Sequence, residues 1–297
     1  MVLSTTPTSS MDMLLIRRGW ENCAPQPADV EQDFSIDAVP NELILHCFSF
    51  LHPKELDNTR RVCRKWNDLS NVELEKTDLK GLEKLFPKLT ILDLRVWEKY
   101  IDLAKHGLEV CDTLPPRRDE VIEVMTELFA TAKIENDAGI TLLAVPRGYS
   151  LESANKSAKT PLKGNPTCIR YVSEGVRNQL GNQKVKKTYY VAITNSVLTG
   201  SRNKSVEYQK ALLHEIGCAM PPYLSMLVLN LLTRIISSAT PSTCLYDEDT
   251  YSRGEETVEM YGRDFHTVVG GFVLDGLFAD SLNYDNSTIG VAALRKF

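Results

Sequence analysis

The residues most suggestive of chemistry are His214 and Glu215, which Cys218 follows in the run His-Glu-Ile-Gly-Cys. In the HExxH zinc motif, two histidines one helical turn apart bind the metal, and the glutamate activates a water molecule. Cys218 stands where the second histidine would be, and no third ligand lies nearby in the sequence. We therefore interpret residues 205–217 as an amphipathic helix that exposes His214 and Glu215, and we predict neither a metal site nor a cofactor.

A thiol nucleophile is the second chemistry that the residue types allow. It would require Cys168 or Cys218 to meet His214 or His266, together with an orienting Asn or Asp. Neither cysteine lies in a recognisable nucleophile motif, and a free cysteine more often behaves as a small buried hydrophobe. The acidic segment 247–256 lacks the fixed spacing of a calcium loop and is predicted to be a solvated loop.

The elements that would position these residues alternate between helix and strand. Three- and four-residue apolar spacing predicts helices, and runs of β-forming residues predict strands. The predicted helices are 98–106, 119–133, 151–158, 169–180, 205–217 and 222–237, and the predicted strands are 89–96, 140–145, 188–198, 267–278 and 288–294. This order indicates a mixed α/β domain over residues 89–297. Since no leucine-rich, tryptophan-aspartate or kelch period is present, a repeat solenoid or propeller is not expected.

Composition limits the class of protein. A chain of 297 residues with 43% hydrophobic residues can bury a sizeable core. A net charge of -5 without a long basic stripe argues against a nucleic-acid partner. The longest apolar run, residues 223–236, is shorter than the roughly 20 residues that span a bilayer, so no membrane segment is expected. Seven cysteines without a CxxC pair are typical of reduced thiols in the cytoplasm.

Residues 34–72 carry the most specific pattern in the chain. Pro40 suits a first helical position, because the N–H that proline lacks would be unpaired there anyway. His52-Pro53 ends this first short helix and opens a second, and a third follows around Trp66. About 40 residues in three such helices cannot form an independent core, so their apolar face needs a partner.

This pattern resembles an F-box. The matching residues are Pro40, Glu42, Leu43, Ile44, Phe48, Leu51, Pro53, Leu56, Val62, Cys63 and Trp66. Val39 replaces the usual leucine, and Asp57, Thr59 and Arg61 stand where the family usually has apolar residues. The resemblance implies a non-catalytic adaptor that binds the Skp-type linker subunit of an SCF (cullin-RING) ubiquitin ligase and recruits a protein substrate. The residues implied in linker binding are Pro40, Leu43, Ile44, Phe48, Leu51, Pro53, Leu56, Val62, Cys63 and Trp66.

A second resemblance concerns segments 200–204, 268–272 and 290–297. They look like elements of large paralogous families in amoeba-dwelling, obligate intracellular bacteria, which implies an effector secreted into the host cytoplasm. The predicted fold class is α+β, with a mobile tail (1–33), an F-box (34–72), a linker (73–88) and a mixed α/β substrate-recruiting domain (89–297). Two alternatives stay open: an enzyme of unknown type in the last domain that uses the F-box for recruitment, and an interaction protein whose F-box has decayed.

Overall fold

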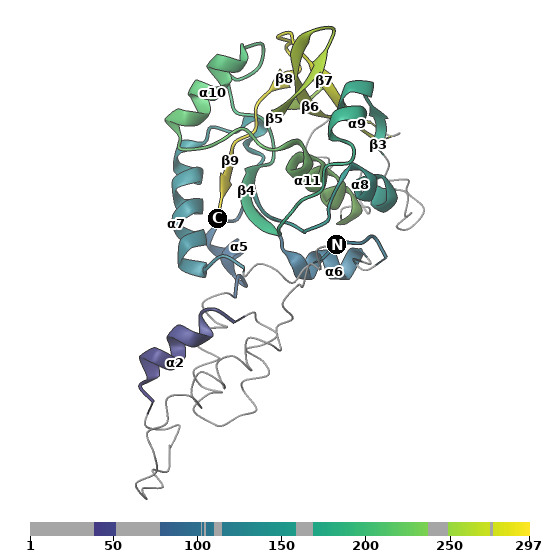
Figure 1. Ribbon diagram of the computed structural model, residues 1–297. Coiled ribbons are helices and arrows are strands. Elements are labelled where there is room, and N and C mark those ends of the chain that lie inside the picture. Colours follow the sequence, from purple (N-terminus) through teal and green to yellow (C-terminus); the bar gives the residue numbers. More distant parts are fainter. Residues whose placement is uncertain are drawn as a thin grey trace, which may run out of the picture. The chain divides into compact units, whose positions relative to one another are not determined.

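A computed structural model describes residues 39–51, 78–101, 103, 105–109, 115–158, 169–236, 249–273 and 276–297 (Figure 1). The chain divides into two compact units, residues 1–44 and 45–297. Helix α2 (Asn41–Phe48) crosses that boundary. We therefore describe α2 by itself, and then the body formed by the described residues from 78 onward.

Helix α2 begins directly after Pro40, as its sequence predicts. The Pro40 carbonyl accepts hydrogen bonds from the backbone N–H groups of Leu43 and Ile44, at 3.1 and 3.3 Å. At the other end the Leu51 N–H bonds to the Phe48 carbonyl at 3.0 Å, which closes the helix with a tighter turn. The helix is therefore only eight residues long.

The body contains two mixed sheets, which confirms the α+β class. In the four-stranded sheet the order is β1 (Leu89–Leu92), β2 (Ile140–Val145), β4 (Tyr189–Thr194) and β9 (Leu294–Lys296). β1 is parallel to β2, and the other two pairings are antiparallel. In the five-stranded sheet the order is β3 (Ile169–Val172), β7 (Gly276–Leu282), β6 (Arg263–Val273), β5 (Tyr251–Met260) and β8 (Ile289–Gly290). Neither sheet forms a closed barrel or a solenoid.

Helix α11 (Tyr223–Ile236) is the centre of the body. It packs against β2 of one sheet and against β5 and β6 of the other, and residues 223–232 are all buried. This burial explains the long apolar run in the sequence, because a helix that is hydrophobic on all sides must be enclosed. Across the helices that the structure describes, none has the length and apolar character needed to cross a bilayer.

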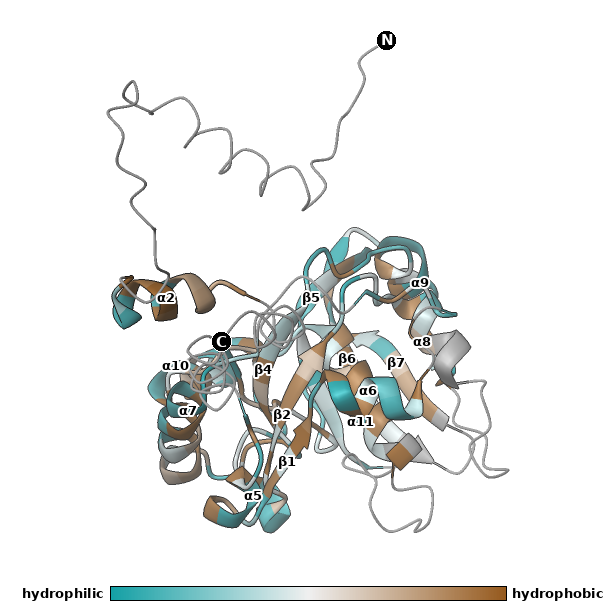
Figure 2. Ribbon diagram, turned by 90° about the horizontal axis from the view of Figure 1, so that it is seen from below, coloured by the Kyte–Doolittle hydropathy of each residue, from teal (hydrophilic) through white to brown (hydrophobic). Residues whose placement is uncertain are grey.

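Helix α7 (Arg118–Thr131) covers the other face of the four-stranded sheet (Figure 1). Val121, Met125 and Leu128 of α7 cluster with Ile140 and Leu142 of β2. Leu143, the next residue along β2, belongs instead to the cluster that contains α11. Both faces of β2 are therefore buried, and Figure 2 shows hydrophobic residues along β1, β2 and β4.

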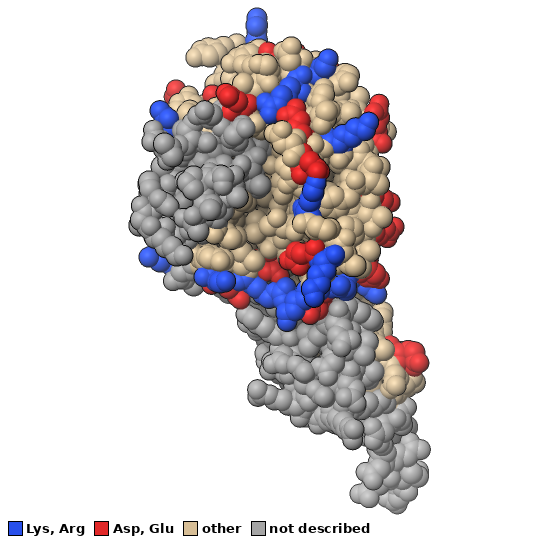
Figure 3. Space-filling model, turned by 180° about the vertical axis from the view of Figure 1, so that it is seen from behind, with Lys and Arg blue, Asp and Glu red and all other residues tan. Residues whose placement is uncertain are grey.

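The remaining helices lie before or between the strands in sequence. They are α5 (Leu82–Leu85), α6 (Leu94–Tyr100), the short 3-10 helix Glu135–Asp137, α8 (Leu151–Ala158), α9 (Glu174–Leu180) and α10 (Val206–Glu215). On the face that Figure 3 presents, Lys and Arg side chains are intermixed with Asp and Glu side chains.

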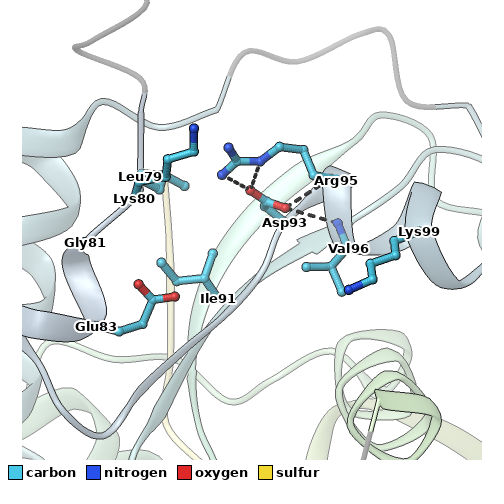
Figure 4. A pocket seen from close by; sticks show the side chains of 9 residues that line it. All are labelled: Leu79, Lys80, Gly81, Glu83, Ile91, Asp93, Arg95, Val96 and Lys99. Carbon is cyan, nitrogen blue, oxygen red and sulfur yellow. Dashed lines mark hydrogen bonds and ion pairs between the residues drawn. The ribbon is translucent and has the colours of Figure 1, made fainter.

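Several predicted elements were wrong in part. The predicted helix 98–106 overlaps α6 only as far as Tyr100, and the predicted strands 267–278 and 288–294 each cover parts of two separate strands. The predicted strand 89–96 ends at Leu92, because Asp93 caps α6 by accepting hydrogen bonds from the N–H groups of Arg95 and Val96 (Figure 4). The first residues of the predicted helix 169–180 form strand β3, and α9 begins only after Ser173. Most of the described part of the predicted acidic loop 247–256 belongs to strand β5.

Candidate functional site

Helix α2 carries two apolar rows that differ in exposure. Ile44 and Phe48, one helical turn apart, are buried, with 5% and 3% of their surfaces exposed. Leu43 and Phe50 are 57% and 71% exposed. Pro40 is exposed and Leu51 is half-buried. The helix therefore presents an outer apolar row to solvent, whereas the inner row is already covered.

Of the ten residues implied in linker binding, some lie within the part of the chain that the structure describes and some lie outside it. Five of them, Pro40, Leu43, Ile44, Phe48 and Leu51, lie on or beside α2. The other five, Pro53, Leu56, Val62, Cys63 and Trp66, lie outside the described residues.

Phe50 is an exposed aromatic residue that the set of ten does not include. Its ring meets the His46 ring edge to face, with centroids 5.0 Å apart, which helps to hold it beside the helix. Phe50 follows the end of α2 at Phe48, and the signal that points to it is its place in the apolar spacing of residues 43–51.

The residues that suggested zinc chemistry do not form the geometry of that motif. Helix α10 ends at Glu215, and Gly217 has a left-handed φ of 64°. Cys218 turns back so that its N–H bonds to the Leu213 carbonyl at 2.9 Å. Among the described residues, no group of three or more His, Cys, Asp or Glu side chains could hold a metal ion.

The candidate nucleophile Cys218 is a poor one in this environment. Burial raises the pKa of its thiol to about 11, so it stays protonated near neutral pH. His266, its suggested partner, lies on β6 with its Nδ1 atom 3.2 Å from the Gly254 carbonyl oxygen. Cys168 lies outside the described residues.

Glu256 has a structural partner far along the chain. A register shift between Arg253 and Thr257 places a β-bulge in β5. The Glu256 carboxylate accepts a hydrogen bond from the N–H of Tyr223, at 2.8 Å, in the first turn of α11. Burial raises the pKa of this carboxyl, although the hydrogen bond from Tyr223 opposes that shift. The prediction of a solvated acidic loop was therefore wrong at Glu256.

Residues 291–293, here called the inter-sheet crossing, carry the chain from β8 in one sheet to β9 in the other. All three residues are buried, and each backbone N–H donates to a buried hydroxyl group. Val291 donates to Ser201 at 3.1 Å, Ala292 to Ser252 at 2.9 Å and Ala293 to Thr194 at 3.0 Å. These hydroxyls satisfy donors that neither sheet ladder pairs.

The three segments of the second resemblance gather around this crossing. Segment 200–204 supplies Ser201, and it also supplies Arg202, whose guanidinium bonds to the Thr250 hydroxyl, the Thr288 carbonyl and the Glu135 carboxylate. Segment 290–297 contains the crossing itself, and segment 268–272 pairs with β5 through Gly270 and Tyr251. In the described residues, the interactions of these segments connect the strands and loops where the chain passes from one sheet to the other.

The comparisons with known proteins agree with the pattern at α2. Residues 36–74 match the family model described as F-box-like. The class of module is therefore an F-box-like domain, which implies a Skp-type binding partner and is consistent with a non-catalytic adaptor. No curated protein and no solved structure matches the chain.

Proposed function

We propose that this chain is an F-box adaptor that binds the Skp-type linker subunit of an SCF ubiquitin ligase and recruits a protein substrate for ubiquitination. The F-box-like match at residues 36–74 is the observation that carries the proposal. Such a role needs no catalytic side chain, because holding a substrate near the charged ubiquitin-conjugating enzyme raises its local concentration.

The exposed row of α2 supports a docking role for this helix. Leu43 and Phe50 are large apolar side chains held in water, and a partner that covers them gains the free energy of burying them. Ile44 and Phe48 are already buried, so in this conformation they are not exposed to a partner. We therefore propose that Leu43, Phe50 and the half-buried Leu51 contact the linker subunit.

The division of the chain proposed above assigns residues 34–72 to linker binding and residues 89–297 to substrate recruitment. Leu79 and Leu82 lie within the proposed linker, residues 73–88, yet both are buried in the cluster that contains α7. The end of that linker is therefore part of the rigid body.

We further propose that the adaptor acts as a bacterial effector in the cytoplasm of a eukaryotic host. The resemblance of segments 200–204, 268–272 and 290–297 to families in amoeba-dwelling bacteria supports this proposal. Because an F-box partner is a component of eukaryotic ubiquitin ligases, an effector with this module would act inside the host cell.

Co-purification with a eukaryotic Skp-type linker subunit tests the adaptor proposal. The intact chain should retain the linker, and a chain lacking residues 34–72 should lose it. Leu43→Asp should also abolish retention, because a carboxylate would have to be buried without a partner. Leu85 of α5 has the same 57% exposure, so Leu85→Asp is the matched control and should bind normally. Equal retention of the linker by Leu43→Asp and Leu85→Asp would refute docking through this row.

A further inference from the structure

The turn that joins β5 to β6 has an unfavourable residue at its most exposed position. Met260 pairs with Arg263, so Tyr261 and Gly262 alone form the turn. Their φ values are 54° and 71°, and two-residue turns with positive φ at both positions are usually built from Asn-Gly. A bulky aromatic residue is strained at such a φ. Tyr261 gains no packing in return, because it is 95% exposed.

The strand pair beside this turn is unfavourable as well. Glu259 and Asp264 lie directly opposite each other, where like charges are destabilising. Both carboxylates are exposed, and neither forms an ion pair within the part of the chain that the structure describes. Arg263 points to the opposite face of the hairpin, because side chains alternate along a strand. The face of Glu259 and Asp264 therefore carries two negative charges without a paired cation.

The backbone of this turn is nevertheless held in place by α9. The Glu259 N–H donates to the Gln179 side-chain oxygen at 2.9 Å, and the Glu259 carbonyl accepts from the Gln179 side-chain nitrogen at 2.7 Å. Met260 packs against α9 at Gly175, where an added Cβ would lie 2.7 Å from the Met260 sulfur. The fold therefore presents Tyr261 from a fixed backbone, which lowers the entropy lost when a partner covers it.

Local features that cost stability without a compensating gain are expected at functional sites. Tyrosine is also one of the residues that contribute most to binding at protein interfaces. We propose that Tyr261 is an anchor for the protein that the adaptor recruits. This partner offers an apolar pocket for the Tyr261 ring, and basic side chains beside the pocket pair with Glu259 and Asp264. The assignment to a recruited protein rests on the proposed function, whereas binding of a protein with such a pocket does not.

Two substitutions in the full chain separate binding from stability. Tyr261→Asn relieves the strained φ, and Asp264→Lys replaces a like-charge pair with an opposite-charge pair, so neither should lower the Tm. Both should weaken binding, Tyr261→Asn about tenfold or more and Asp264→Lys about fivefold, since an anchor side chain contributes more than one exposed ion pair. Tyr208→Asn, at a tyrosine of α10 that is 49% exposed, is the matched control and should leave binding unchanged.

Photo-cross-linking supplies the partner on which these affinities are measured. The probe is the full chain in which p-benzoylphenylalanine replaces Tyr261, irradiated in a eukaryotic lysate. The control probe carries the same replacement at Tyr208. We expect a protein that cross-links to the first probe and not to the second, and whose purified form binds the variants in the order given above.

Several outcomes would overturn the inference. They are the absence of a product specific to the first probe, equal affinities of Tyr261→Asn and Tyr208→Asn, an affinity of Asp264→Lys equal to that of the unchanged chain, and a Tm that falls in both turn variants. Linker co-purification is measured on the same preparations. If the linker binds and no partner depends on Tyr261, the anchor inference fails and the adaptor proposal stands. If a partner depends on Tyr261 and the linker does not bind, the turn stands as a protein-binding site and the adaptor proposal fails.

Discussion

Removing the Ser201 hydroxyl should destabilise the body measurably. Ser201 and Val291 are both fully buried, and the Ser201 oxygen accepts the Val291 N–H at 3.1 Å. Ser201→Ala fits the same space, since it deletes one atom without adding any. The Val291 N–H then loses its side-chain acceptor inside the protein, where water cannot replace it. Such an unsatisfied buried donor costs about 1–3 kcal/mol.

This cost converts into a change in melting temperature. For a body of this size, each kcal/mol shifts the Tm by about 2–4 °C. Ser201→Ala should therefore lower the Tm by about 2–12 °C, measured by calorimetry or by circular dichroism on the full chain. Ser287, an exposed serine whose hydroxyl donates to the side chain of its neighbour Asn286, gives the control Ser287→Ala. That change should remain within about 0.5 kcal/mol, as surface substitutions do.

A Tm for Ser201→Ala equal to that of Ser287→Ala would refute this reasoning. It would mean that the Val291 N–H finds another acceptor, so that the hydroxyl groups at the inter-sheet crossing are replaceable. The same comparison applies to Ser252→Ala, whose oxygen accepts the Ala292 N–H at 2.9 Å. A loss in both serine variants would show that the crossing depends on each hydroxyl separately.

Two further predictions concern β5 and its turn. Tyr261 and Gly262 join β5 to β6 with φ values of 54° and 71°, a turn geometry that favours the pair Asn-Gly. Tyr261→Asn should therefore raise the Tm by about 2 °C. An unchanged or lower Tm would contradict this. The raised pKa of Glu256 means that its stabilising contribution is complete at low pH and is lost as the pH rises through the folded-state pKa. The Tm of Glu256→Gln relative to the unchanged chain should therefore increase between about pH 4 and pH 7, and a constant difference across that range would argue against the shift.

Much of the body can be predicted from local patterns. Pro40 marks the start of α2, the apolar stripe of residues 119–133 marks α7, and the run 223–236 marks α11. The strand 140–145 was predicted with the bounds that the structure shows. In each case the residues that decide the structure lie close together in the sequence, so periodicity and capping are sufficient.

The sequence-based predictions fail at residues whose conformation depends on a side-chain hydrogen bond. Asp93 alternates with its neighbours like a strand residue, but its carboxylate caps the helix that follows. Glu256 appears solvated in the sequence, and only the fold brings it to the first turn of α11, about 30 residues away along the chain. Both outcomes depend on hydrogen bonds that apolar periodicity does not encode.

The candidate site could likewise be predicted only in part. Spacing alone identifies an apolar face on residues 40–51 that is wide for so short a helix. It does not distinguish the covered row of Ile44 and Phe48 from the open row of Leu43 and Phe50, because that depends on tertiary packing.

Helix α11 has a practical consequence for dissecting this protein. Because α11 packs against both sheets, a fragment that contains only one sheet would leave apolar surface exposed. Fragments designed around one sheet should therefore aggregate, whereas the whole stretch from residue 78 to residue 297 should transfer as a single cassette. Fusion of that cassette to a different ligase-binding module would then redirect whatever it captures.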